Sequence, residues 1–214
     1  MNTAIVIGAT GLVGRSLIRQ LLEDPDYSRV ITLVRRAAAE HHEKLVEHIV
    51  DFDHPESFAE LVNGHVLFST MGTTRGQAGS LEAQRKVDYT YQLEVAELAA
   101  RKGVKAYGLV SSAGSNPNSV FPYMKMKGEL ERDVQRLGFA SLQILRPGPL
   151  AGEREKKRVG EEVARTVMGA LSAVGLFRSM RPITGDEVAR AMRRAATMAG
   201  TRTHEPDELF RLAQ

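Results

Sequence analysis

The chain contains no cysteine, and this absence removes several kinds of chemistry at once. Disulfide bonds, thiolate nucleophiles and thiolate metal ligands all require the cysteine sulfur. The six histidines do not restore a metal site, because the one adjacent pair, His41 and His42, cannot face a single ion from a regular helix. We therefore expect neither a redox-active thiol nor a bound metal.

Long hydrophobic runs are also missing. No apolar stretch approaches the roughly 18 residues that a membrane-spanning helix needs. The chain runs from Met1 directly into an apolar segment, without the basic region and cleavage site of a signal peptide. We therefore expect a cytoplasmic protein with no membrane partner.

The chain also lacks a strong excess of charge of either sign. The chain has 29 Lys and Arg against 26 Asp and Glu, which gives a formal charge of +3 and a pI of about 9.3. This mild excess suits an anionic cofactor, but the basic residues are spread along the chain, so we expect no nucleic-acid partner. The densest basic run, 154–158, is interrupted by Glu155 and followed by Glu161 and Glu162, which is typical of solvated surface rather than of a polyanion site. The sequence does not indicate protein partners.

Short apolar runs alternate with helical patterns along the 214 residues. We expect strands at 4–7, 30–34, 46–50, 66–69, 107–110 and 141–145. Helices are expected after Gly11, at 55–62, 81–102 and 123–137, and behind a capping box formed by Thr184 and Glu187. Continuously apolar strands indicate burial on both faces, as in a parallel sheet covered by helices. We predict an α/β fold with a doubly wound parallel sheet (Rossmann fold). It forms a single domain, 1–214, to which 149–214 contribute a helical substrate-side lobe.

Three glycines mark the junction between the first expected strand and the first expected helix. In such a turn, the first glycine permits the sharp bend, the second lets the backbone approach a diphosphate and the third allows close helix packing. The free N–H groups and the dipole of the helix favour the phosphate charge. The alternative is a glycine-rich turn without a ligand. We predict a dinucleotide site at this turn, formed by Gly8, Thr10, Gly11, Leu12, Val13 and Gly14.

The end of the second expected strand bears on the choice of cofactor. An NAD enzyme usually places an acidic side chain there for the ribose 2′-hydroxyl, whereas this chain has Arg35 and Arg36 and no carboxylate before Glu40. A guanidinium pair suits a 2′-phosphate, so we favour NADP(H) over NAD(H), although paired arginines can simply be solvated. At the end of the third strand, Asp51 and Phe52 are candidates to cover the adenine, and Phe52 is equally a candidate for the core.

A tyrosine and a lysine four residues apart form the candidate catalytic pair. Tyr123 and Lys127 share one face of an expected helix, and Ser112 ends the strand before it. A tyrosine, whose ordinary pKa is about 10, exchanges protons readily only if a nearby cation favours its anion. In carbonyl reduction Tyr123 would protonate the oxygen while Ser112 donates a hydrogen bond to it, and Lys127 would hold the cofactor ribose. Ser111 is the alternative hydroxyl, and Lys125 is expected to face solvent.

Taken together, these motifs resemble the short-chain dehydrogenase/reductase superfamily in its atypical or extended branch, over essentially the whole chain. The matching pieces are the glycine turn, the strand end at 110–113, Tyr123 with Lys127, and the segment 146–148. More narrowly, the segment 71–79, followed by Val87 and Asp88, is similar to the Tat-interacting-protein oxidoreductase family.

This resemblance implies further roles. It places Thr70, Met71, Gly72 and Thr73 along the nicotinamide side of the cofactor, and Arg146, Pro147 and Gly148 at the nicotinamide end of the pocket. One residue departs from the pattern: Asp88 stands where many extended members carry the asparagine that completes a catalytic tetrad. The resemblance therefore does not extend to a proton relay through that position.

The leading hypothesis is an NADP(H)-dependent oxidoreductase that reduces a small carbonyl compound or oxidises an alcohol. The alternative is a regulatory or scaffold protein that binds NADPH without turnover. The segments 113–120 and 150–181 are expected to form the substrate wall, because loops at this edge of a parallel sheet carry specificity. Arg75, Arg178 and Arg181 are candidates to bind an anionic substrate, although isolated surface arginines are the commoner explanation. The sequence names no compound.

Overall fold

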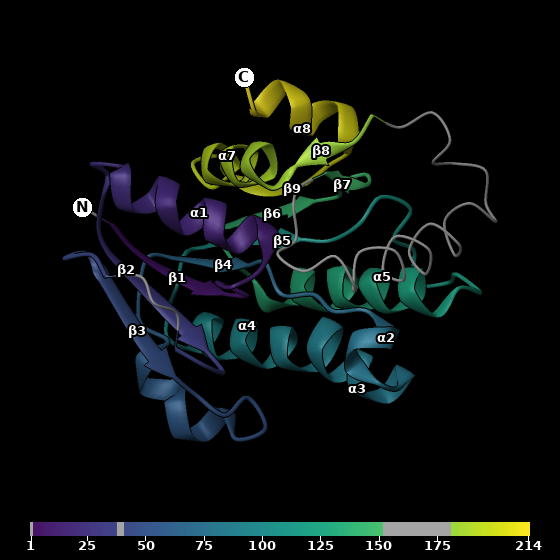
Figure 1. Cartoon of the computed structure of the whole chain (residues 1–214), viewed down its shortest axis with the longest axis horizontal. Coiled ribbons are helices and arrows are strands. Elements are labelled where there is room, and N and C mark those ends of the chain that lie inside the picture. The colour runs from purple at the N-terminus through teal and green to yellow at the C-terminus, as the bar shows by residue number, and fades with distance from the viewer. Residues whose placement is uncertain (1, 38–40, 152–180) are drawn as a thin grey trace.

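A seven-stranded parallel sheet organises the computed structural model, which describes residues 2–37, 41–151 and 181–214 (Figure 1). The spatial order is β3-β2-β1-β4-β5-β6-β9, and every pair of neighbours is parallel. The strands are β1 (Asn2–Ile7), β2 (Tyr27–Val34), β3 (Leu45–Ile49), β4 (Val66–Ser69), β5 (Ala106–Val110), β6 (Ser141–Leu145) and β9 (Gly200–His204). A separate two-stranded ladder pairs β7 (Leu150–Ala151) with β8 (Ile183–Thr184). The predicted doubly wound parallel sheet is confirmed.

Helices cover both faces of this sheet. In Figure 1, α1 (Leu12–Glu23), α7 (Gly185–Ala195) and α8 (Pro206–Leu212) lie on one side, and α4 (Tyr91–Arg101) and α5 (Pro122–Val134) lie on the other. Alternate residues of β1 enter two separate hydrophobic clusters. Ile5 and Ile7 pack on the α4 side, whereas Ala4 and Val6 pack on the α1 side. Burial on both faces is the reason that the strands read as continuous apolar runs.

The capping box is present as expected. The Thr184 hydroxyl accepts a hydrogen bond from the Glu187 N–H at 3.1 Å, and the Glu187 carboxylate accepts one from the Thr184 N–H at 2.8 Å. These reciprocal bonds satisfy backbone donors at the start of α7. The helix then buries Val188, Ala191 and Met192 in the core, largely against α1.

Two expected helices need correction, and further elements were not expected. The predicted helix at 55–62 is a 3₁₀-helix, η1 (Pro55–Leu61). The predicted helix at 81–102 consists of α3 (Leu81–Arg85), a π-helical turn, η2 (Lys86–Thr90), and α4. The sequence reading missed β9 and α8. Four of the five β9 residues are exposed, because β9 forms the edge of the sheet, so this strand carries no apolar signal.

Several expectations fall on residues outside the described part of the chain. Glu40 lies there, as do 154–158 with Glu161 and Glu162, Arg178, and most of the expected substrate wall. Among the residues that the structure describes, no helix is both long and apolar enough to cross a membrane. Within the same ranges, no three His, Asp or Glu side chains come together to hold a metal ion.

Candidate functional site

The glycine turn joins β1 to α1 and packs tightly against the end of β4. Gly8 has φ = +81°, and a Cβ built on it would lie 2.4 Å from the Met71 nitrogen. A Cβ on Gly14 would lie 2.2 Å from the Gly8 carbonyl oxygen. Side chains at these two positions would collide with backbone atoms, which have no freedom to move away. Gly8 and Gly14 are therefore required for packing, whatever the turn binds.

The start of α1 is open to a ligand. Gly11 is the N-cap, no side chain caps the helix, and the first turn carries no acidic residue. Thr10 and Gly11 are exposed, Leu12 is half-buried and Val13 is buried in the core. The first N–H groups of a helix have no intrahelical acceptor, so an uncapped N-terminus of this length offers donors and a favourable dipole to an anion. This arrangement can bind a phosphate group.

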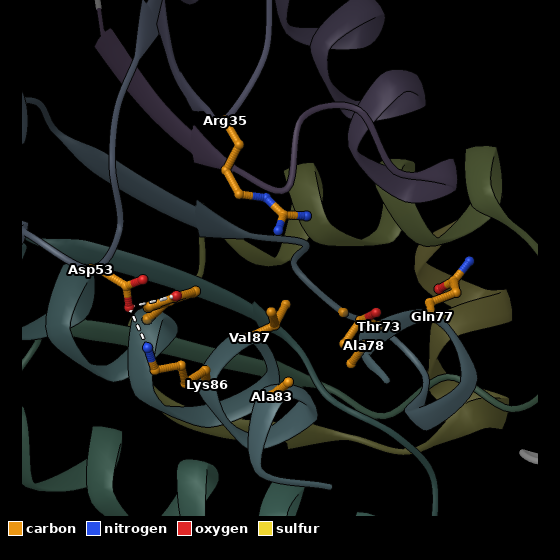
Figure 2. A pocket seen from close by; sticks show the side chains of 10 residues that line it. Arg35, Asp53, Thr73, Gln77, Ala78, Ala83, Lys86 and Val87 are labelled. Carbon is orange, nitrogen blue, oxygen red and sulfur yellow. Dashed lines mark hydrogen bonds and ion pairs between the residues drawn. The ribbon is translucent and has the colours of Figure 1, made fainter. Parts of the chain in front are cut away.

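A pocket of about 550 Å³ lies between the residue that follows β2 and the segment 72–91. Figure 2 shows Arg35, from the end of β2, on one side of it and residues of the segment 73–87 on the other. Asp53 lies in its wall with its carboxylate already engaged: Oδ1 accepts hydrogen bonds from Lys86 Nζ at 2.7 Å and from the Tyr91 hydroxyl at 2.8 Å. These two bonds hold the pKa of Asp53 below its ordinary value. Lys86 is thus paired with Asp53, and the exposed guanidinium of Arg35 lies on the opposite side of the pocket.

The other residues expected at the adenosine end are placed differently. Arg36 is exposed and is not part of the pocket wall. Asp51 is exposed, and its carboxylate accepts a hydrogen bond from the Asp53 N–H at 3.0 Å. Phe52 is 3% exposed and packs against the rings of Phe58 and Tyr91, each with its centroid 5.6 Å away. The core interpretation of Phe52 is therefore the one that the structure supports.

The predicted catalytic groups converge at the carboxyl edge of the sheet. Tyr123 and Lys127 lie on one face of α5, and Ser112 is the second residue after β5. Ser112 is close enough to Tyr123 to affect its ionisation, and so is Lys127. Lys125 is exposed, as expected. The structure thus brings the three residues into one group.

The electrostatics of Tyr123 differ from the expectation. Burial raises the pKa of Tyr123 most strongly and Asp88 raises it further, while Lys127 and Ser112 act in the opposite direction. The net effect is an increase, whereas the sequence led us to expect that Lys127 would favour the tyrosinate. The main reason is burial, and a buried carboxylate next to Lys127 adds to the increase by offsetting the ammonium charge.

That carboxylate belongs to Asp88. Its Oδ1 lies 3.1 Å from Lys127 Nζ, and the two side chains are only 1% and 3% exposed. Its Oδ2 accepts a hydrogen bond from the Thr73 N–H at 3.1 Å. Asp88 sits in the π-helical turn η2, and such turns are frequent at functional sites because they redirect a side chain. The carboxylate therefore links the loop after β4 to α5.

Two glutamines hold the same loop. Gln92 accepts a hydrogen bond from the Ser69 hydroxyl at 2.7 Å and donates one to the Met71 carbonyl at 3.3 Å, and Gln84 donates one to the Thr73 carbonyl at 3.4 Å. On the other side, the Thr70 hydroxyl donates to the Ile7 carbonyl at 3.0 Å. The segment 70–73, expected along the nicotinamide side, is thereby fixed between β1 and the helices. The sequence reading missed both glutamines, because no local motif marks them.

The structure also separates the two candidate serines. Ser111 donates its hydroxyl proton to the buried carboxylate of Glu131, which forms an ion pair with Arg146. Arg146 also pairs with Glu205 at 2.8 Å, and its pKa is raised chiefly by its hydrogen bonds with Glu131. Ser111 and Arg146 are thus occupied in a structural network, and Ser112 is the hydroxyl left beside Tyr123.

The remaining candidate residues lie outside the group formed by Ser112, Tyr123 and Lys127. Pro147 is buried and its carbonyl accepts a hydrogen bond from the Ala113 N–H at 3.0 Å, which joins the half-buried Gly148 region to the loop after β5. Arg75 is exposed at the start of α2 (Arg75–Ala78). Arg181 lies over the Phe210 ring at 4.7 Å. Both look like surface arginines in the structure, and neither contacts the catalytic group.

The chain is similar to a known protein family and to several known proteins. The HIM1 family model matches residues 26–179. The protein named FMP52, mitochondrial, from Saccharomyces cerevisiae is 40% identical over 194 residues, covering 87% of this chain and 84% of that protein. A protein of the same name from Emericella nidulans is 40% identical over 181 residues, covering 81% and 78%.

Solved structures share the fold at low sequence identity. MoeE5 in complex with UDP-glucose and NAD matches with a TM-score of 0.71 and 16% identity, over 95% of this chain and 75% of that one. The Helicobacter pylori ADP-L-glycero-D-manno-heptose-6-epimerase matches with a TM-score of 0.71 and 19% identity, over 96% and 76%. These likenesses agree with the fold of the extended short-chain dehydrogenase/reductase branch.

Two expectations are corrected by these comparisons. The narrower family that they name is FMP52, and not the Tat-interacting-protein family that the segment 71–79 resembles. The predicted cytoplasmic location is wrong, because relatives at about 40% identity are named mitochondrial proteins. The absence of a signal peptide, on which the cytoplasmic expectation rested, says nothing about other destinations.

Proposed function

Because this chain belongs to the FMP52 family and has the fold of the extended short-chain dehydrogenases/reductases, we propose that it is an NADP(H)-dependent oxidoreductase. It reduces a small carbonyl compound or oxidises an alcohol. The observation that carries this proposal is the convergence of Ser112, Tyr123 and Lys127 at the same edge of the sheet as the open N-terminus of α1. A protein that only binds a dinucleotide does not need this group.

The described residues fit a nicotinamide dinucleotide. The uncapped start of α1 supplies N–H donors for the diphosphate, and the exposed Gly11 leaves room for its approach. Arg35 faces the pocket and supplies a charged fork for a 2′-phosphate. Asp53, the carboxylate in the same wall, is neutralised by Lys86, so it does not repel that phosphate. This arrangement favours NADP(H) over NAD(H).

Each catalytic side chain has a role that follows from its place. When bound, the nicotinamide supplies or accepts a hydride at the substrate carbon. The Tyr123 hydroxyl donates a proton to the carbonyl oxygen in reduction and accepts one in oxidation. Ser112 donates a hydrogen bond to the same oxygen as negative charge grows on it. Lys127 positions the cofactor ribose and, with Asp88, sets the charge around Tyr123.

Measurement of NADPH consumption across a panel of small carbonyl compounds tests the proposal. Tyr123→Phe removes the proton donor, and we expect it to lower kcat/KM about 100-fold or more. Tyr89→Phe is the matched control, since the Tyr89 hydroxyl bonds to Asp133, away from the site, and its loss should leave turnover unchanged. Activity that survives Tyr123→Phe would refute Tyr123 as the proton donor.

One observation favours the second candidate function, an NADPH-binding regulatory protein without turnover. The Asp88 carboxylate neutralises the ammonium that would otherwise assist Tyr123. Calorimetric titration with NADPH and NADH separates the possibilities. Binding of NADPH without its oxidation by any compound of the panel would favour the regulatory protein. Failure of the folded protein to bind either dinucleotide would overturn both.

A further inference from the structure

The Asp88–Lys127 pair lies beside the proton donor and is almost fully enclosed. The carboxylate and the ammonium are 3.1 Å apart, with side chains 1% and 3% exposed. A charge in such surroundings needs a partner, because desolvation of a lone ion is costly. Burial lowers the pKa of Lys127, but its ion pair with Asp88 outweighs this effect and raises that pKa, so the pair carries no net charge towards Tyr123.

The other described groups around Tyr123 and Lys127 do not offset the charge of the Lys127 ammonium as Asp88 does. Glu131, one turn beyond Lys127 on α5, also favours the ammonium, but it is committed to Arg146 and to the Ser111 hydroxyl. Ser112, after β5, is the neutral neighbour of Tyr123. Asp88 is thus the described carboxylate that acts on both Tyr123 and Lys127.

Asp88 is held in this place by the backbone. The π-helical turn η2 interrupts the helical segment between α3 and α4, and the Thr73 N–H donates a hydrogen bond to the second carboxylate oxygen. A Cβ at Gly72 would lie 3.5 Å from Asp88 Oδ1, so the loop after β4 closes over the carboxylate. Both oxygens are therefore engaged, one by a cation and one by an amide.

We propose that Asp88 is a positioning residue that cancels the charge of Lys127 next to Tyr123, and so keeps Tyr123 protonated and ready to donate. This inference rests on the proposed function. Its consequence is that the site works as a carbonyl reductase over the physiological pH range, and that alcohol oxidation requires alkaline conditions. An ammonium without its carboxylate would instead favour the tyrosinate and extend oxidation to lower pH.

Asp88→Asn tests this role, because the amide keeps an acceptor for the Thr73 N–H and removes the charge. We expect the alkaline midpoint of kcat/KM for reduction to fall by about one pH unit or more. The midpoint belongs to the coupled Tyr123 and Lys127, and loss of the carboxylate makes the first proton easier to remove from either. Asp133→Asn is the matched control on α5, where it pairs with Arg132 and Arg136, and should not move the midpoint.

A spectroscopic titration keeps this test separate from the proposed function. The ultraviolet absorption of tyrosinate is followed with pH, and the Tyr123 signal is the difference between the wild-type protein and Tyr123→Phe. We expect this signal to appear at lower pH in Asp88→Asn than in the wild type, even if no substrate turns over. An unchanged midpoint in a folded Asp88→Asn protein would overturn the proposal.

The wild-type protein provides the test if Asp88→Asn does not fold. Ionisation of Tyr123 below the ordinary tyrosine range in the wild type would then overturn the proposal, because an ammonium whose charge is cancelled cannot favour the tyrosinate to that extent. Complete absence of turnover, combined with the expected shift in the tyrosinate signal, would reject the oxidoreductase while leaving the role of Asp88 intact.

Discussion

Two adjacent arginines differ in whether their side chains line the pocket. Arg35 and Arg36 both follow β2, but of the two only Arg35 lines the pocket. Its guanidinium faces a wall in which the one carboxylate, Asp53, is bound to Lys86 and Tyr91. The geometry thus separates two residues that the sequence left almost equivalent, and Arg35 is the one to which the proposed 2′-phosphate recognition falls.

Arg35→Ala is expected to weaken NADPH binding by about ten- to a hundredfold, because a charge-assisted hydrogen bond contributes about 1.5–3 kcal/mol. Affinity for NADH, which has no 2′-phosphate, should change little. Calorimetric titration of both dinucleotides measures the difference. Arg36→Ala serves as the control and should have the smaller effect. Equal losses for NADPH and NADH would show that Arg35 does not read the 2′-phosphate.

At the scale of elements, the β1–α1 turn combines a packing requirement with a binding requirement. A Cβ at Gly14 would lie 2.2 Å from the Gly8 oxygen, whereas a Cβ at Gly11 would lie 3.3 Å from that oxygen. Gly11 has φ = −76°, which any residue adopts. Substitution of Gly14 therefore tests the packing requirement, and substitution of Gly11 tests the binding requirement.

We expect Gly14→Ala to lower the free energy of unfolding by about 1–3 kcal/mol, because overpacking displaces backbone. Gly11→Ala should change it by less than about 1 kcal/mol but weaken NADPH binding tenfold or more, since the methyl group occupies the path of the diphosphate. Urea unfolding and calorimetry give the two quantities. Normal NADPH affinity in Gly11→Ala would indicate that the diphosphate does not lie against this turn.

The helical segment after β4 is a second element in which local geometry serves the site. A continuous α-helix from Leu81 to Arg101 would turn Asp88 to a different angle, because each π-helical turn contains an additional residue. With η2 in place, Asp88 reaches Lys127 and Gln92 reaches the loop after β4. The irregularity thus orients two polar side chains toward one loop.

At the scale of the whole molecule, buried tyrosines make stability depend on alkaline pH. Tyr27 is 6% exposed at the start of β2, and burial, reinforced by Asp24, raises its pKa to about 12. The unfolded chain ionises this phenol near pH 10, as an ordinary tyrosine does. Between these two values, ionisation therefore favours the unfolded state. The stabilisation is fully present below about pH 10 and is lost as the pH rises through about 12.

The free energy of unfolding should accordingly fall by up to about 3 kcal/mol over this range on account of Tyr27. Urea unfolding at a series of pH values measures the slope. In Tyr27→Phe this part of the slope should vanish, and the remainder should reflect other buried phenols such as Tyr107, whose pKa burial also raises. An identical slope in both proteins would mean that Tyr27 ionises in the folded state as easily as in the unfolded chain.

The sequence by itself determined the fold class, the glycine turn and the helical face that carries Tyr123 and Lys127. These features are local: burial on both faces produces continuous apolar strands, a tight turn requires glycine, and a spacing of four places side chains together on a helix. Each can be recognised in a window of a few residues.

Only the tertiary structure decided which polar groups meet. The pairing of Asp88 with Lys127, the engagement of Asp53 by Lys86 and Tyr91, and the commitment of Ser111 to Glu131 each join distant segments. The polar edge strand β9 likewise takes its place from its neighbour β6. Such contacts have no local pattern, because a hydrogen bond or ion pair depends on where the backbone brings two side chains, and the core alone sets that arrangement.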